Sequence, residues 1–82
     1  MIDLILKQYY DESFIVIDGF DDAIIGVEEK NMILIYSVSK CLKILHLEMS
    51  DIDALEYFNF NISGAYVGEK TPIFCNDNIY KY

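Results

Sequence analysis

The spacing of apolar residues changes once along this chain, at Ser37, and this change limits the fold more than any other feature. Before Ser37, short apolar runs rich in β-branched and aromatic residues are separated by turn residues, which is typical of strands. After it, Val38, Cys41, Leu45 and Met49 recur at steps of three and four residues, which is typical of an amphipathic helix. The sequence therefore predicts strands that are followed by helices.

Three apolar runs are expected to form strands before Ser37. They are residues 13–17, 23–27 and 32–36. The last two runs flank a four-residue polar loop, so we expect a hairpin in which Asn31 takes a left-handed conformation. Gly26, inside the second run, indicates a bulge or a close backbone approach. Residues 2–10 fit either a strand or a helix, because their periodicity does not distinguish the two.

Two helices and a final strand are expected after that point. Ser37 or Ser39 can cap the first helix, and Ser50 can cap the second. The expected buried stripe of the second helix is Ile52, Leu55, Phe58 and Ile62. Gly64 is suited to end this helix. Because Pro72 has no N–H to donate, the strand that follows should begin there or lie at a sheet edge.

These elements predict an α+β fold: a small antiparallel sheet of three to five strands with two consecutive helices packed on one face. The chain has 82 residues and contains no linker, repeat or low-complexity tract. We therefore expect a single domain over residues 1–82. Phe14, Phe58 and Phe74 fall at expected core positions.

The charge balance argues against several kinds of partner. Fourteen acids face six lysines and no arginine, which gives a net charge of −8. Such a field repels polyanions, and no guanidinium is present to clamp a phosphate, so direct nucleic-acid binding is not expected. The acidity either keeps the chain in solution or forms a face for a basic partner. Most of it lies in residues 1–31, which hold eight acids and two lysines.

The sequence also predicts where the protein works. Residues 1–7 include an acid at position 3 and lack a long apolar run, so no secretion signal is expected there. No apolar stretch approaches the roughly 18–20 residues of a membrane span. We therefore expect a cytoplasmic protein with no membrane partner, whose two cysteines are reduced.

No catalytic, metal-binding or cofactor-binding motif is expected. Cys41 and His46 are five residues apart, a spacing that does not place them on one helical face. Two cysteines and one histidine fall short of the usual four zinc ligands. The acids of residues 18–22 lack the spacing of a calcium loop, and Gly64 and Gly68 are one residue too close for a phosphate loop.

Twelve tyrosines and phenylalanines exceed what the core of a small domain needs. Tyr57, Phe60 and Tyr66 cluster around the end of the second expected helix. Tyrosine is enriched at interface hot spots, so these three residues are candidates for an aromatic partner surface. The alternative is a second, smaller packing cluster.

Several segments of this chain resemble a group of small uncharacterised proteins of tailed bacteriophages. They are Phe20–Val27, Tyr36–Ser37, Lys40–Cys41, Ile44–Leu45, Met49, Ala54, Glu56–Phe58, Phe60–Asn61 and Gly64–Phe74. The resemblance covers about residues 18–75, and Gly64–Phe74 is its most specific part. Because that group carries no assigned activity, it transfers no functional residue. It implies a phage gene product that acts in the bacterial cytoplasm.

Small acidic phage proteins without catalytic motifs resemble inhibitors of host machinery. The resemblance, together with the acidic charge, therefore implies a non-enzymatic protein that binds and blocks a basic host protein, such as a component of a nucleic-acid-targeting defence system. The candidate acidic contacts are Asp11, Glu12, Asp18, Asp21, Asp22, Glu28 and Glu29. The alternative is a structural or assembly protein that self-associates through strand edges or through the region from Tyr57 to Tyr66.

Overall fold

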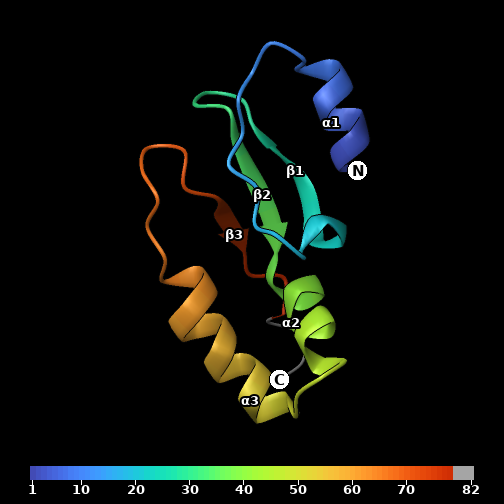
Figure 1. Cartoon of the computed structure of the whole chain (residues 1–82), viewed down its shortest axis with the longest axis vertical. Helices are drawn as coiled ribbons and strands as arrows, with labels where there is room; N and C mark the ends of the chain where they lie inside the picture. The colour runs from blue at the N-terminus through green and yellow to red at the C-terminus, as the bar shows by residue number, and fades with distance from the viewer. Residues whose placement is uncertain (79–82) are drawn as a thin grey trace.

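Strand β2 is the middle strand of a mixed three-stranded sheet, with helices at both ends of the molecule (Figure 1). The computed structural model describes residues 1–78. Its strands are β1 (Ile24–Glu28), β2 (Ile33–Ser37) and β3 (Ile73–Cys75). Its helices are α1 (Ile2–Gln8), α2 (Val38–His46) and α3 (Asp51–Tyr57), with a 3₁₀ turn η1 (Asp21–Ala23) and a π-helical turn η2 (Phe58–Ser63).

The expected hairpin is confirmed, and so is the bulge. Strands β1 and β2 pair antiparallel, and their register shifts between Ile24 and Gly26. The left-handed residue of the loop is Met32, with a φ of 56°, and the expectation for Asn31 was wrong. The Glu28 carboxylate accepts hydrogen bonds from both the backbone and the side-chain amide of Asn31, which fixes that residue inside the turn. The change of direction therefore falls on the next residue.

The expectation of an all-antiparallel sheet was wrong, because β3 pairs parallel to β2. Ile35 lies opposite Ile73, and Ser37 lies opposite Cys75. Both helices α2 and α3 are in the connection between these strands, and a crossover of this length returns the chain in the same direction. Pro72 immediately precedes β3, and β3 is an edge strand. Both positions agree with the expectation from the missing N–H of Pro72.

Residues 13–17 do not form the expected strand. They run as an extended segment that passes in front of β2 (Figure 1). The backbone N–H of Ile17 donates to the Tyr36 hydroxyl at 2.8 Å, and the side chains of Phe14 and Ile17 pack against the core. The β-branched and aromatic side chains of residues 13–17 therefore pack on the sheet, and this segment does not pair as a strand at the sheet edge.

The ambiguous first segment is the helix α1. Ile5 is its buried residue, with 6% of its surface exposed, and α1 contacts β1. Leu4 and Leu6 face outward and are 70% and 49% exposed. Only one side of this short helix is thus covered by the rest of the protein.

Both expected serine caps are present on α2 and α3. Ser37 Oγ accepts from the N–H of Lys40 at 3.1 Å, and Ser50 Oγ accepts from the N–H of Asp53 at 3.2 Å. Figure 1 shows α2 and α3 beyond the end of the sheet at which β2 finishes, so they close this end more than they cover a face. Gly64 ends the second helical stretch, as expected.

The buried stripe of α3 differs from the expected one. Ala54, Phe58 and Ile62 are buried at four-residue steps, whereas Ile52 and Leu55 are 72% and 44% exposed. The small Ala54 side chain lets α3 lie close to α2, and Phe58 and Ile62 are the buried residues of η2. Phe74 of β3 meets the Phe58 ring edge to face, at 5.3 Å between centroids.

A carboxylate ties the segment after β3 to the start of α2. Ser37 Oγ donates to Asp77 Oδ2 at 2.5 Å, and the N–H of Ser39 donates to Asp77 Oδ1 at 2.8 Å. Partial burial raises the pKa of Asp77, but the hydrogen bonds from Ser37 and Ser39 outweigh this and hold the pKa below its usual 3.8. We call the contact of Asp77 with Ser37 and Ser39 the Asp77 latch. It stabilises the ionised form of the Asp77 carboxylate.

Asp77→Asn should lower the free energy of unfolding by about 1 to 3 kcal/mol at neutral pH, since a charge-assisted acceptor is lost while Ser37 stays buried. Because the folded-state pKa is lowered, the contribution of Asp77 is complete above pH 3.8 and is lost as the pH falls below that value. Urea unfolding of both proteins at neutral pH and near pH 3 measures the difference.

Asp11→Asn serves as the control for this variant, because Asp11 is exposed and its change should stay within about 0.5 kcal/mol. An equal loss of stability in the two variants, or a difference between Asp77→Asn and the parent protein that does not shrink at low pH, would contradict the role assigned to the latch.

Candidate binding surface

The seven acids expected to meet a partner fall into two groups, and one group is largely engaged within the protein. Glu12 lies 3.7 Å from Lys70 Nζ, and Glu29 accepts from the Tyr9 hydroxyl at 2.7 Å. Glu28 accepts hydrogen bonds from its own loop, including the N–H of Asn31 at 3.1 Å. These three carboxylates are therefore engaged within the protein, whereas Asp11, the chain neighbour of Glu12, is exposed.

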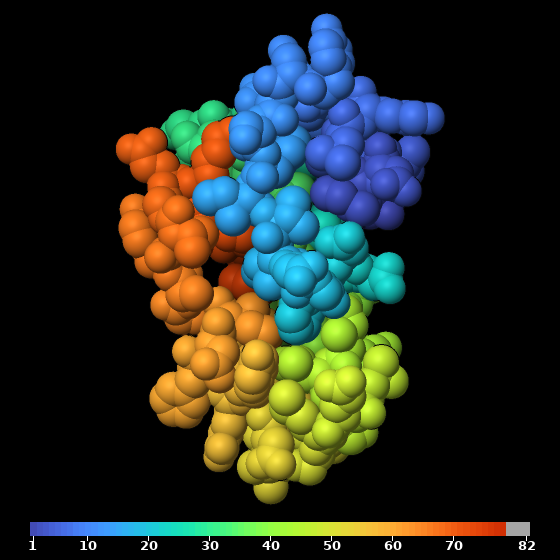
Figure 2. All heavy atoms as spheres, viewed as in Figure 1, coloured from blue at the N-terminus to red at the C-terminus, as the bar shows by residue number. Residues whose placement is uncertain are grey.

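The second group is Asp18, Asp21 and Asp22, around η1. All three are exposed, and within residues 1–78 their carboxylates make no hydrogen bond or ion pair. Strand β1 separates this group from Glu28, and a five-residue strand spans about 13 Å at 3.3 Å per residue. Figure 2 shows the two regions well apart, the loop after β1 in green and η1 in cyan. The seven acids thus form no single continuous track.

Two of the three candidate aromatic residues share a hollow on the protein surface. The residues that line it are Met49, Asp53, Glu56, Tyr57, Phe60 and Asn61, and its volume is about 440 Å³. We call it the α3 hollow. Tyr57 is 42% exposed and Phe60 is 82% exposed. Tyr66 is also exposed, but it lies on the loop after η2 and does not line this hollow.

The sequence reasoning missed Asp53 and Glu56, whose carboxylates border this hollow. Four side chains here have the spacing i, i+3, i+4 and i+7, which places side chains on one face of a helix. They are Asp53, Glu56, Tyr57 and Phe60. This signal was present in the sequence. The sequence analysis placed the candidate acidic contacts in residues 11–29, outside this helix.

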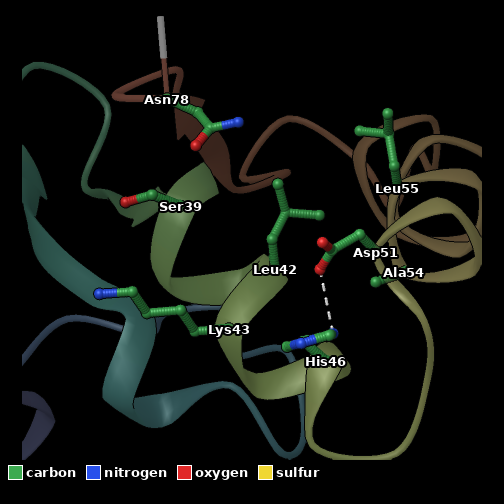
Figure 3. Close-up of a pocket in the computed structure, with 8 residues that line it drawn as sticks. All are labelled: Ser39, Leu42, Lys43, His46, Asp51, Ala54, Leu55 and Asn78. Atoms are coloured by element: carbon green, nitrogen blue, oxygen red, sulfur yellow. Dashed lines mark ion pairs between the residues drawn. The ribbon is translucent and has the colours of Figure 1, made fainter. Parts of the chain in front are cut away.

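A second pocket, of about 340 Å³, lies between α2 and α3 (Figure 3). His46 Nδ1 lies 3.1 Å from an Asp51 carboxylate oxygen and 2.9 Å from the backbone oxygen of Met49. Ser39 lines the same pocket, but it precedes His46 by seven residues, which is about 10.5 Å along a helix. This separation prevents direct proton transfer from Ser39 to His46. In Figure 3 the Lys43 ammonium points away from the histidine.

The two thiols have different environments. Cys41 is fully buried, and burial first and the charge of Asp77 second raise its pKa to about 11. Cys75 is exposed on the edge strand β3. Neither cysteine forms a disulfide. Over residues 1–78 no three side chains of histidine, cysteine, aspartate or glutamate gather in a way that could hold a metal ion.

Comparison with protein-family models, with curated proteins and with solved structures finds no match to this chain. The helices of residues 1–78 also include none of the length and apolar character that a membrane crossing requires. Function must therefore be inferred from the geometry described above.

The two cysteines should react with a disulfide reagent at very different rates. At pH 8 the exposed Cys75 should react within minutes, whereas Cys41 should react only when the protein unfolds, because it is buried and its raised pKa leaves little thiolate. Absorbance of the released thiolate follows both reactions. Cys75→Ser should remove the fast phase, and a fast phase that persists in this variant would contradict the assignment.

Proposed function

We propose that this protein is a non-enzymatic, phage-type accessory protein that binds a basic protein of the bacterial host and obstructs it. The observation that carries the proposal is the combination of exposed carboxylates that have no partner within residues 1–78 and exposed aromatic rings in one small protein. Asp18, Asp21 and Asp22 supply such carboxylates around η1, and Tyr57 and Phe60 supply such rings at the α3 hollow.

Charge and aromatic area contribute to different stages of binding. A net charge of −8 attracts a lysine- and arginine-rich surface over long range and speeds encounter. Tyr57, Phe60 and Tyr66 then bury apolar area at short range, where most of the affinity arises. A basic cleft of a nucleic-acid-targeting defence protein, met in the bacterial cytoplasm, has the complementary chemistry.

The distribution of the acids supports steric cover more than imitation of a DNA backbone. Of the seven candidate acids, Glu12, Glu28 and Glu29 contact other groups of the protein, and the η1 group is separated from Glu28 by the length of β1. A partner would therefore meet separate acidic points and an aromatic patch, and not an evenly spaced row of charges.

Affinity capture from a nuclease-treated bacterial lysate tests the proposal. A basic protein should be retained at about 50 mM salt and released near 0.5 M salt, where the Debye length is much shorter. The triple variant D18N, D21N, D22N should retain at least tenfold less of it, because attraction to the η1 group is lost.

The matched control is D3N, E48Q, E69Q, which changes the net charge equally at exposed acids elsewhere. Similar losses in both triple variants would assign the effect to net charge and not to the η1 group. Absence of any basic partner at both salt concentrations would overturn the proposal for that host.

Self-association is the second candidate function, and the exposed apolar side of α1 favours it. Leu4 and Leu6 are exposed there, and Ile73 is 41% exposed on the open edge of β3. Light scattering over a range of protein concentrations distinguishes the two functions. The inhibitor proposal predicts a monomer throughout, whereas a stable homo-oligomer that shields Tyr57 and Phe60 would replace it.

A further inference from the structure

We propose that the α3 hollow receives an arginine side chain of the partner protein. This inference rests on the proposed function, because it specifies how the basic partner is held. Its basis is the arrangement of Asp53, Glu56, Tyr57 and Phe60 on one face of α3 and η2, around a surface hollow of about 440 Å³.

The α3 hollow is an open, shallow surface whose charge suits a guanidinium group. Its lining includes two carboxylates, of Asp53 and Glu56, and no cationic side chain. In the described part of the chain neither carboxylate has an ion-pair partner. A guanidinium can donate to a carboxylate through two parallel N–H groups while its flat face stacks on an aromatic ring. Tyr57 and Phe60 offer such rings beside the carboxylates.

A similar arrangement of a cation, an aromatic ring and a carboxylate occurs elsewhere in this protein. Lys70 Nζ lies 5.7 Å from the centroid of the Phe14 ring and 3.7 Å from a Glu12 carboxylate oxygen, and it also donates to the backbone oxygen of Ser13 at 2.6 Å. There a ring, a carboxylate and a cation come together within one chain. At the α3 hollow the rings and the carboxylates are present, and no cationic side chain of residues 1–78 lies with them.

Arginine fits the hollow better than lysine. Two carboxylates and two rings line the hollow. A planar guanidinium with five donors can donate to the edge of a carboxylate and stack on a ring face at the same time. A lysine ammonium is a compact, strongly hydrated charge that gains less from stacking. The chain itself contains no arginine, so no guanidinium of its own competes for the hollow.

The pocket between α2 and α3 is a weaker candidate for the same role. Asp51 already faces His46 at 3.1 Å, and the lining includes Lys43. A cationic side chain would compete there with the histidine for Asp51. Asp53 and Glu56 at the α3 hollow face no such competitor within residues 1–78.

Titration with two short peptides, one rich in arginine and the other with lysine at the same positions, tests the inference directly. Calorimetry should show the arginine peptide binding about tenfold more tightly than the lysine peptide, with amide NMR shifts centred on residues 49–61. The double variant D53N, E56Q and the single variant F60A should each weaken binding of the arginine peptide about tenfold. The double variant D21N, D22N removes equal charge at η1 and should have a smaller effect.

Each variant should keep the helical circular dichroism and thermal unfolding of the parent, because Asp53, Glu56 and Phe60 are exposed. Equal binding of both peptides, or equal losses in the α3 and η1 variants, would overturn the inference.

Capture from lysate separates the two proposals. A basic partner retained equally well by the parent and by F60A would overturn the arginine site and leave the proposed function intact. Peptide binding at the α3 hollow without any captured partner would overturn the proposed function for that host and leave the arginine site intact.

Discussion

The burial of Tyr36 in the middle strand is the interaction on which the other elements depend. Its side chain has no exposed surface, its ring lies 5.9 Å from that of Phe74 on β3, and its backbone pairs with Ile24 on β1. Its hydroxyl accepts from the N–H of Ile17 and so holds the segment that crosses the sheet. Burial raises the pKa of this hydroxyl above its usual value, while the hydrogen bond from Ile17 acts in the opposite direction. One residue thus joins both edge strands and the covering segment, β1 through its backbone and the other two through its side chain.

The candidate surface depends on this arrangement through the connection between β2 and β3. Parallel pairing requires a long crossover, and this crossover carries α3 and η2 beyond the end of the sheet. Phe58 and Ile62 face inward from that stretch, which leaves Tyr57 and Phe60 turned to the surface. The exposed rings are therefore a consequence of packing on the other side of the same helix, and not of a lack of core.

Local features were predictable from the sequence, and long-range features were not. The two serine caps, the hairpin, the Gly26 bulge and the edge position of β3 each follow from a few neighbouring residues. The parallel pairing and the contact of Ser37 with Asp77, 40 residues away, require knowledge of where a crossover ends. Residues 13–17 have strand composition but no strand partner, because β-branched residues suit a sheet face as well as a sheet edge. The acids of the α3 hollow were detectable from helical spacing alone.

The pairing of β2 with β3 also has a kinetic consequence. Strand β2 and the α2 cap are complete by Lys40, but β3 and the Asp77 latch join them only after residue 77 has been synthesised. Contacts of such sequence separation slow folding, because the loop between them must close first. We therefore expect the local hairpin of β1 and β2 to form before the pairing of β2 with β3, which closes the other side of β2. The crossover that carries the α3 hollow takes its final position only in this late step.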